Sequence, residues 1–322
     1  MTGEPRILLH NDATARHAVR LRSAFPGCDV AECNTYASLP DMIREFRPDV
    51  VFTIRFAGSQ GFPRDALLAP GGPRWIANGG AGTDHFGQWD PACTTITNAA
   101  GVAADMMAEY MLGGFLHFTL DIEGLRQDKA GRKWRARNMV PLRGKTLLVV
   151  GLGHTGRALA EKSKALGMRV AGVRSRLRSD ECVDIVGGPD DLHGFLQDAD
   201  CVAVCAPLTP ATRGMIGRAE IAAMKPGVLL ADVSRGGIVD QSALAGALVS
   251  GHVAGAALDV FETEPLPTDN PLWGIDNLII SPHCSSVYDG WEDATFDLFL
   301  DNLDRWIAGS PLRNVVDPER GY

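Results

Sequence analysis

"TLLVVGLGHTGRALAEKSKALG", residues 146–167, is the stretch that decides the fold of this chain. A short apolar run, typical of a buried strand, leads into the glycine pattern at 151–156, and a helical run follows it. Gly151 allows a tight turn, Gly153 lets the backbone approach a pyrophosphate, and Gly156 lets the helix pack on the strand. A glycine-rich turn without a ligand is the alternative, but the strand–loop–helix frame favours a dinucleotide-binding unit.

Similar apolar runs recur on both sides of this unit and predict the rest of the fold. Later strand candidates, separated by helical runs, lie at residues 169–173, 201–206, 228–233, 254–258 and 278–281. An earlier series with the same alternation lies at residues 6–10, 29–33, 49–54, 74–78 and 94–97. Long helix candidates lie at residues 101–120 and 289–311. Strands that alternate with helices indicate an α/β chain with two doubly wound parallel sheets.

The composition argues against several kinds of partner and site. A chain of 322 residues has room for two hydrophobic cores. Its net charge of −8 argues against nucleic acid or an anionic membrane as a partner. Seven cysteines without a CxxC pair indicate neither a disulfide framework nor a zinc site, so we expect no metal and a cytoplasmic location. The sequence shows no signal peptide and no apolar run of about 20 residues, so we expect no membrane span.

Two arginines stand where a dinucleotide-binding unit usually carries an acid. Arg174, Ser175 and Arg176 follow the strand candidate at 169–173. A carboxylate there would accept a hydrogen bond from a free ribose 2′-hydroxyl, whereas a guanidinium fork can hold the oxygens of a 2′-phosphate. The sequence therefore predicts NADP(H) as the preferred cofactor, with NAD(H) as a possible second one. A solvated basic turn, continued by Arg178, is the alternative.

Residues just after the strands of the second series supply the groups that a hydride-transfer site needs. Ligands bind beyond the carboxyl ends of the strands in an open α/β sheet, and Arg235, Asp259, Glu264 and His283 fall there. Arg235 can hold a substrate carboxylate, and His283 can donate a proton to the oxygen that becomes a hydroxyl. Glu264 can orient that histidine and favour its protonated form. A surface arginine, a structural histidine and a solvated glutamate are the alternatives.

Five ordered motifs resemble one family of enzymes. They are "GLGHTG" (151–156), "PLTPATRGMI" (207–216), "SRGGIVDQSAL" (234–244), "ALDVFETEPLP" (257–267) and "NLIISPH" (277–283), and the family is the D-isomer-specific 2-hydroxyacid dehydrogenases. The resemblance implies Arg235, Glu264 and His283 as catalytic residues. It also implies a flavodoxin-like substrate domain at 1–101 and 284–322, a Rossmann cofactor domain at 102–283, and an active site in the cleft between them.

The resemblance also assigns contacts to individual residues. Substrate contacts are expected at Gly80, Ala81, Gly82, Arg235 and His283, and Arg55 is a further candidate because it stands at a strand end. Cofactor contacts are expected at Gly151, Leu152, Gly153, His154, Thr155, Gly156, Arg174, Ser175, Arg176, Ala206, Pro207, Thr212, Val233, Ser234, Asp259, His283 and Ser285. Asp259 would accept from the nicotinamide carboxamide. Arg55 has a solvated position as its alternative.

The resemblance further implies a homodimer and a substrate class. Trp134 resembles a family position on a segment that wraps the other subunit. Arginines after the second strand resemble the NADPH-preferring glyoxylate/hydroxypyruvate reductase branch, so we expect reduction of small 2-oxo acids to 2-hydroxy acids of D configuration. The alternatives are a dehydrogenase for a bulkier aryl or branched D-2-hydroxy acid and a cofactor-sensing, corepressor-like binding protein. Cys284, where the family usually has a small residue, is either a packing residue or an oxidant-sensitive thiol.

Overall fold

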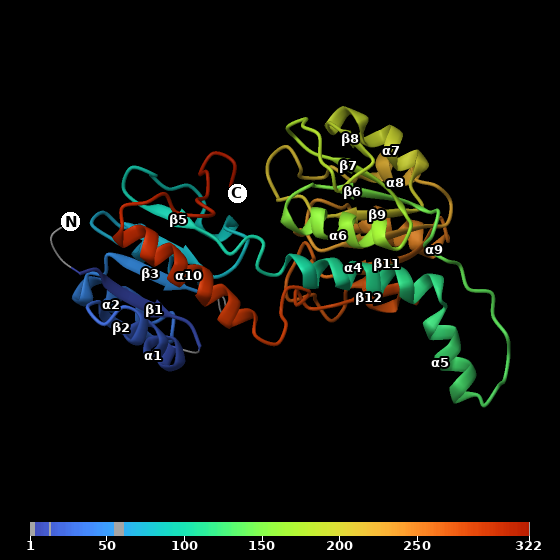
Figure 1. Ribbon diagram of the computed structural model, residues 1–322. Helices are drawn as coiled ribbons and strands as arrows, with labels where there is room; N and C mark the ends of the chain where they lie inside the picture. Colours follow the sequence, from blue (N-terminus) through green and yellow to red (C-terminus); the bar gives the residue numbers. More distant parts are fainter. Residues whose placement is uncertain (1–3, 13, 55–60, 322) are drawn as a thin grey trace. The chain divides into compact units, whose positions relative to one another are not determined.

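The computed structural model describes residues 4–12, 14–54 and 61–321, and the chain divides into two compact units (Figure 1). Unit 1 consists of Met1–Val102 and Asp289–Tyr322, and unit 2 is Ala103–Tyr288. The chain therefore leaves unit 1 once and returns to it for its last segment. The domain boundaries inferred from the resemblance, at 101/102 and 283/284, stay a prediction.

Unit 1 is built on a five-stranded sheet in which every strand pairing is parallel. The strand order β2-β1-β3-β4-β5 is that of a flavodoxin-like fold, as the sequence predicted. Its strands are β1 (Arg6–His10), β2 (Asp29–Cys33), β3 (Val50–Thr53), β4 (Trp75–Asn78) and β5 (Thr95–Thr97). Its helices are α1 (Thr14–Ala24), α2 (Leu39–Phe46), α3 (Arg64–Leu67), the 3₁₀ turn η1 (Asp84–Phe86) and α10 (Trp291–Ile307).

The last segment returns to unit 1 because α10 completes its core. Phe296 and Phe299 of α10 are buried, and their rings lie 5.3 Å and 4.9 Å from the ring of Phe52 in β3. Phe299 also contacts Trp75 of β4 at a ring distance of 5.5 Å. Burial of large aromatic side chains contributes on the order of 2 kcal/mol each, so the helix is held to this face of the sheet by apolar packing.

Unit 2 is built on a seven-stranded parallel sheet with the order β12-β11-β10-β9-β6-β7-β8. The strands are β6 (Thr146–Val150), β7 (Arg169–Val173), β8 (Ile185–Gly187), β9 (Cys201–Val204), β10 (Val228–Asp232), β11 (Val253–Leu258) and β12 (Leu278–Ile280). This is the Rossmann order extended by one strand, which confirms the predicted fold class. The sequence did not reveal β8, because its apolar run consists of only two residues, Ile185 and Val186, and ends at Gly187.

Helices cover both faces of this sheet. The covering helices are α4 (Ala104–Thr119), α6 (His154–Ala165), α7 (Leu192–Asp198), α8 (Arg218–Ala223) and α9 (Gln241–Val249). Unit 2 also contains α5 (Ile122–Ala130), which extends away from the sheet (Figure 1), and the 3₁₀ turns η2 (Pro189–Asp191) and η3 (Pro271–Gly274). Alternate residues of β6 enter different cores: Leu147 and Val149 pack with α4 and α6, whereas Leu148 and Val150 pack with α7, α8 and α9. Burial on both faces explains why these strands are continuously apolar.

Across the described parts of the chain, we find no helix that combines the length and the apolar character needed to cross a membrane.

Candidate active site

The residues that the sequence places just after strands, among them Arg235, Glu264 and His283, lie on loops that leave one edge of the unit 2 sheet. All strand pairings in this sheet are parallel, so the loops after β6, β7, β9, β10, β11 and β12 leave from one side. The glycine loop follows β6, Arg174 follows β7, Arg235 follows β10, and His283 lies on the loop after β12. The topology therefore gathers groups that the sequence separates by up to about 130 residues.

His283 and Glu264 form the pair that the sequence predicted. Nδ1 of His283 lies 2.8 Å from Oε2 of Glu264, and both side chains remain partly exposed. The other carboxylate oxygen, Oε1, accepts the backbone N–H of Phe261 at 2.9 Å. The carboxylate thus holds one ring nitrogen of His283, which leaves Nε2 as the nitrogen that can exchange a proton with a substrate.

Glu264 stays ionised at neutral pH. Partial burial by itself would raise its pKa, but the hydrogen bonds from His283 and from the Phe261 amide, together with the charge of Arg235, lower the pKa below its ordinary value. An ionised Glu264 is an acceptor for the Nδ1–H group of His283, which lies 2.8 Å from its Oε2. The carboxylate therefore fixes the orientation of the imidazole ring.

The buried carboxylate of Asp259 shapes the loop that carries His283. Its Oδ1 accepts the Ser281 hydroxyl at 2.5 Å and the Cys284 backbone N–H at 2.8 Å, and its Oδ2 accepts the Ser285 N–H at 3.0 Å. His283 lies between these anchor points with a φ of 52°, in the left-handed region that residues other than glycine seldom adopt. Asp259, predicted only as a cofactor contact, therefore also fixes the histidine backbone.

A hydroxyl chain links this carboxylate to α4. The Tyr110 hydroxyl lies 2.7 Å from the Ser281 hydroxyl, which in turn bonds Asp259. Burial, in the first place, raises the pKa of Tyr110 to about 12, so its hydroxyl stays protonated and can donate to Ser281.

Arg235 is held by the loop after β10. Its Nη1 donates to the Ser234 carbonyl at 2.8 Å, and the side chain is half-buried. The neighbouring Gly236 lies so close to the next loop that a Cβ atom there would come within 2.0 Å of the Phe261 carbonyl oxygen. This close approach brings the loop with Arg235 against the loop with Glu264, and the charge of Arg235 acts on the Glu264 carboxylate.

Asp232, at the end of β10, is a buried acid that the sequence analysis overlooked. Its Oδ1 accepts the Ser234 N–H at 2.9 Å and also the Ser234 hydroxyl. Burial raises the pKa of Asp232 to about 7, and the charge of Asp259 contributes to this increase. The hydrogen bonds from Ser234 and the charge of Arg235 act in the opposite direction. The signal in the sequence was an acid at the end of an apolar strand, "VLLAD".

The glycine loop has the shape that a dinucleotide pyrophosphate requires. Gly151 has a φ of 103°, and a Cβ there would lie 2.7 Å from the Ala206 nitrogen, so β6 and β9 approach closely at this point. A Cβ at Gly156 would lie 2.1 Å from the Gly151 carbonyl oxygen, whereas a Cβ at Gly153 would meet open space. Gly153 caps α6 without a side-chain hydrogen bond. The residues present therefore fit a phosphate group at the helix N-terminus.

Other predicted cofactor residues lie on the neighbouring loops. Leu152, Ala206, Val233, Ser234 and Ser285 are buried. The Ser285 hydroxyl oxygen has no hydrogen-bond partner among the described residues, which also fits a ligand at this edge. The hydroxyl of Thr155 contacts the Met107 sulfur at 3.7 Å, and that of Thr212 donates to the Pro207 carbonyl at 2.6 Å. Both hydroxyls thus have partners within the chain.

The two arginines after β7 have different surroundings. Arg174 pairs with Asp180 at 3.3 Å, and its side chain is only 13% exposed. Arg176 is exposed. Both arginines were predicted as cofactor contacts, and the contact with Asp180 distinguishes Arg174 from Arg176.

Comparisons with known proteins identify the family of this chain. Residues 112–285 match the family model described as "D-isomer specific 2-hydroxyacid dehydrogenase, NAD binding domain". The chain belongs to the D-isomer specific 2-hydroxyacid dehydrogenase family. It is therefore a member of a family of oxidoreductases that use a nicotinamide cofactor.

Individual members of the family show how far the likeness extends. The chain is 34% identical to a glyoxylate reductase of Aeropyrum pernix over 261 residues, which cover 76% of this chain and 77% of the relative. It is 32% identical to a D-3-phosphoglycerate dehydrogenase of Methanocaldococcus jannaschii over 75% of this chain, but it spans only about half (47%) of that longer relative. A D-isomer specific 2-hydroxyacid dehydrogenase of Xanthobacter autotrophicus, solved with NADPH and MES, aligns over 99% of this chain and 100% of its own, with 30% identity and a TM-score of 0.85.

The other predicted substrate residues belong to unit 1. Gly80, Ala81 and Gly82 form a loop after β4, and the side chains of Asn78 and Asn98 hold its three carbonyl oxygens at 2.7–2.9 Å. A loop with fixed carbonyls also has fixed N–H groups, but contact with a substrate beside Arg235 stays a prediction. Arg55 lies outside the described residues.

The thiol of Cys284 is not activated in this dehydrogenase. Partial burial, and then the charge of Asp259, raises its pKa above the ordinary value. A thiol with a raised pKa stays protonated at neutral pH, which disfavours the oxidant-sensitive role.

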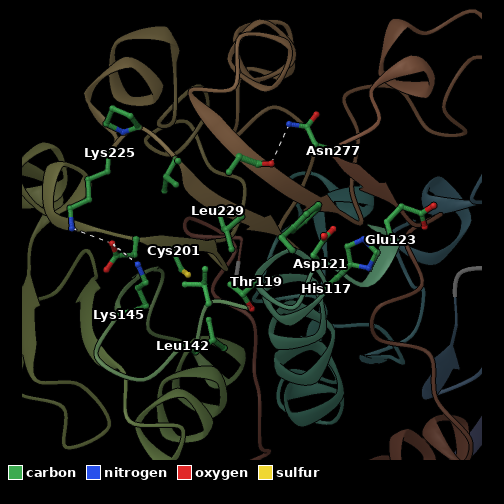
Figure 2. A pocket seen from close by; sticks show the side chains of 17 residues that line it. His117, Thr119, Asp121, Glu123, Leu142, Lys145, Cys201, Lys225, Leu229 and Asn277 are labelled. Carbon is green, nitrogen blue, oxygen red and sulfur yellow. Dashed lines mark hydrogen bonds and ion pairs between the residues drawn. The ribbon is translucent and has the colours of Figure 1, made fainter. Parts of the chain in front are cut away.

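A pocket of about 520 Å³ lies at the opposite edge of the unit 2 sheet (Figure 2). Its walls come from the amino ends of the strands and from the end of α4, and they include Cys201, Leu229 and His117. Lys225 and Lys145 approach the same oxygen of Asp200 at 3.4 Å and 3.8 Å. Because the glycine loop and His283 lie at the carboxyl edge, this pocket is separate from the candidate active site.

We expect Asp232→Asn to change the pH dependence of stability. In the folded state the pKa of Asp232 is about 7, against an ordinary value of 3.8. A raised folded-state pKa gives stability that is fully present below pH 3.8 and is lost as the pH rises through 7. Asparagine keeps an acceptor for Ser234 and does not titrate, so the variant should gain on the order of 2 kcal/mol relative to the wild type between pH 5 and pH 8.

Urea denaturation at both pH values measures this difference. Replacement of the exposed Asp269 by asparagine is the matched control and should leave the pH slope of the wild type unchanged. Parallel slopes for the wild type and Asp232→Asn would show that Asp232 is ionised throughout.

Proposed function

We propose that this protein is an NADP(H)-dependent reductase of small 2-oxo acids, with glyoxylate and hydroxypyruvate as substrates and 2-hydroxy acids of D configuration as products. The hydrogen bond of 2.8 Å between His283 and Glu264 carries the proposal, because it joins a proton donor to an ionised carboxylate at the edge where the glycine loop lies. Arg235 lies beside this pair and supplies the cation that an acid substrate needs.

The chain's own groups divide the work of the reaction between them. A bound nicotinamide supplies the hydride for the carbonyl carbon. Protonated His283 gives the proton to the carbonyl oxygen, so that one hydride and one proton convert the oxo group to a hydroxyl. Glu264 holds Nδ1–H of the histidine and stabilises its positive charge. Arg235 holds the substrate carboxylate and orients the carbonyl for attack.

The proposed preference for NADP(H) rests on the residues after β7. Arg174 and Arg176 put positive charge where a carboxylate would select the free ribose hydroxyl of NAD(H). The Xanthobacter relative, which is 30% identical, was solved with NADPH. The glyoxylate reductase relative supports a small substrate.

We propose that the protein acts as a homodimer through α5 and the segment after it. Arg135 and Arg137 contact the carboxylate of Asp128 in α5 at 3.0 Å and 2.7 Å, so the segment is tied back onto its helix (Figure 1). Trp134 is fully exposed, and Met139 is about half exposed. An ordered segment that exposes large apolar side chains fits burial against a second copy of the chain.

An absorbance assay of NADPH and NADH oxidation tests the proposed reaction. It uses glyoxylate, hydroxypyruvate, pyruvate and phenylpyruvate, each with both cofactors. We expect the highest kcat/KM with NADPH and glyoxylate or hydroxypyruvate. A preference for phenylpyruvate would identify a dehydrogenase for bulkier acids. Equal rates with both cofactors would mean that Arg174 and Arg176 form a solvated turn without a role in cofactor choice. No turnover with any acid would favour the corepressor-like binding protein.

Replacement of His283 by alanine should remove proton transfer and leave cofactor binding intact. We expect kcat to fall by roughly 10²–10⁴-fold, the range for a lost general acid, while the Kd for NADPH stays within about threefold. Stopped-flow turnover and NADPH fluorescence titration measure the two quantities. His193→Ala, at an exposed position of α7, is the matched control and should keep full activity. A normal kcat for His283→Ala would remove His283 from the mechanism.

Sedimentation equilibrium tests the homodimer. We expect twice the chain mass of 34.5 kDa for the wild type. Trp134→Ala should raise the dimer dissociation constant by about tenfold or more, because a large aromatic side chain loses its buried contact. Trp273→Ala, which changes an exposed tryptophan away from this segment, should not. A wild-type mass of one chain would contradict the proposal.

A further inference from the structure

The buried carboxylate of Asp180 joins the glycine-loop helix to the loop after β7. Its side chain is 1% exposed. Oδ2 contacts Nη1 of Arg157 in α6 at 2.9 Å and Nη1 of Arg174 at 3.3 Å, and Oδ1 accepts the Cys182 backbone N–H at 3.2 Å. One carboxylate therefore connects three points that lie up to 25 residues apart in the sequence.

This carboxylate is ionised and is surrounded by positive charge. Burial alone would raise the pKa of Asp180, but the hydrogen bonds from Cys182 and the charges of Arg157 and Arg174 lower it. Burial lowers the pKa of Arg174, and the charge of Arg178 adds to that effect, so a third cation lies near Arg174. Three arginines and one aspartate leave a net charge of about +2, whereas a phosphate monoester carries about −1.5 to −2 at neutral pH.

Asp180 cannot replace the missing acid that would bind a ribose 2′-hydroxyl. Its oxygens are buried and already accept bonds from Cys182, Arg157 and Arg174. The structure therefore gives the aspartate a different task from that of the acid usually found after the second strand. It holds two guanidinium groups that would repel each other without it.

We propose that Asp180 and Arg157 are positioning residues that hold Arg174 and the loop 174–179 in the shape that recognises the 2′-phosphate of NADP(H). The inference rests on the cofactor preference in the proposed function. It assigns that preference to the bridge Arg157–Asp180–Arg174 and not to Arg174 and Arg176 alone. Arg157 anchors the bridge in α6, whose N-terminus faces the pyrophosphate. The carboxylate fixes Arg174 against α6, and Arg176 and Arg178 keep the outer side of the loop positive.

Calorimetric binding of adenosine 2′,5′-bisphosphate and of 5′-AMP tests this bridge without turnover. The two probes differ only in the 2′-phosphate, so the ratio of their Kd values reports recognition of that group even when part of a preparation is unfolded. We expect the wild type to prefer the bisphosphate. Asp180→Asn and Arg157→Ala should each reduce this preference about tenfold, the equivalent of one charge-assisted hydrogen bond, with the Kd for 5′-AMP unchanged.

The double variant and a charge control separate positioning from other effects. Asp180→Asn combined with Arg157→Ala should lose no more preference than the larger single effect, because both act through one bridge. Glu181→Gln removes the same charge from an exposed neighbour and should change nothing. Arg157→Ala, on a partly exposed helix face, tests the bridge even if Asp180→Asn fails to fold.

Three outcomes would overturn the inference. Tighter bisphosphate binding by Asp180→Asn would mean that the carboxylate competes with the phosphate for Arg174. Equal weakening of both probes would make the bridge a general structural element. A wild type without any preference for the bisphosphate would refute the NADP(H) preference itself and the bridge with it, whereas a preference that survives both single variants would refute the bridge alone.

Discussion

The carboxylate of Asp259 is the group on which the geometry of the candidate site depends. It lies at the end of β11 with 1% of the residue exposed, and it accepts the Ser281 hydroxyl and two successive backbone N–H groups of the next loop. A buried charge of this kind is costly unless its hydrogen bonds are satisfied, so the loop must keep the shape that satisfies them. His283 takes its left-handed backbone conformation inside this loop, and its ring then reaches Glu264.

Two further buried acids, each at or near the end of a strand, extend the same principle. Asp232, the last residue of β10, accepts hydrogen bonds from the backbone and the hydroxyl of Ser234, next to Arg235. Asp180, on the loop after β7, contacts Arg157 of α6 and Arg174. Asp180 and Asp232 have opposite pKa shifts because their surroundings differ. The hydrogen bonds from Cys182 and the charges of two arginines lower the pKa of Asp180, whereas burial, followed by the charge of Asp259, raises the pKa of Asp232 to about 7. An acidic chain can thus present a local positive surface to an anionic cofactor.

Much of the fold could be predicted from local sequence because its determinants are local. The strands β1, β2, β6 and β7 have the bounds that their apolar runs predicted, and the glycine pattern identified the turn at which β6 passes into α6. Parallel strands with helical connections leave few topologies, since such crossovers are right-handed. The edge strand β8 was not predicted because only Ile185 and Val186 form its apolar run before Gly187. Arg235, Glu264 and His283 could be named because strand ends in a parallel sheet meet at one edge.

The sequence by itself thus determined the two parallel sheets, the glycine loop, the family and the residues that meet at the reactive edge. Only the tertiary structure decided that Asp259 holds the loop around His283, that burial raises the pKa of Asp232 to about 7, and that Arg174 contacts Asp180 whereas Arg176 is exposed. The physical reason is that hydrogen bonds between distant residues and the loss of hydration at a carboxylate depend on packing in space. Periodicity and motif spacing predict which helices and strands form. They do not indicate which distant residues form hydrogen bonds or how far a carboxylate is buried.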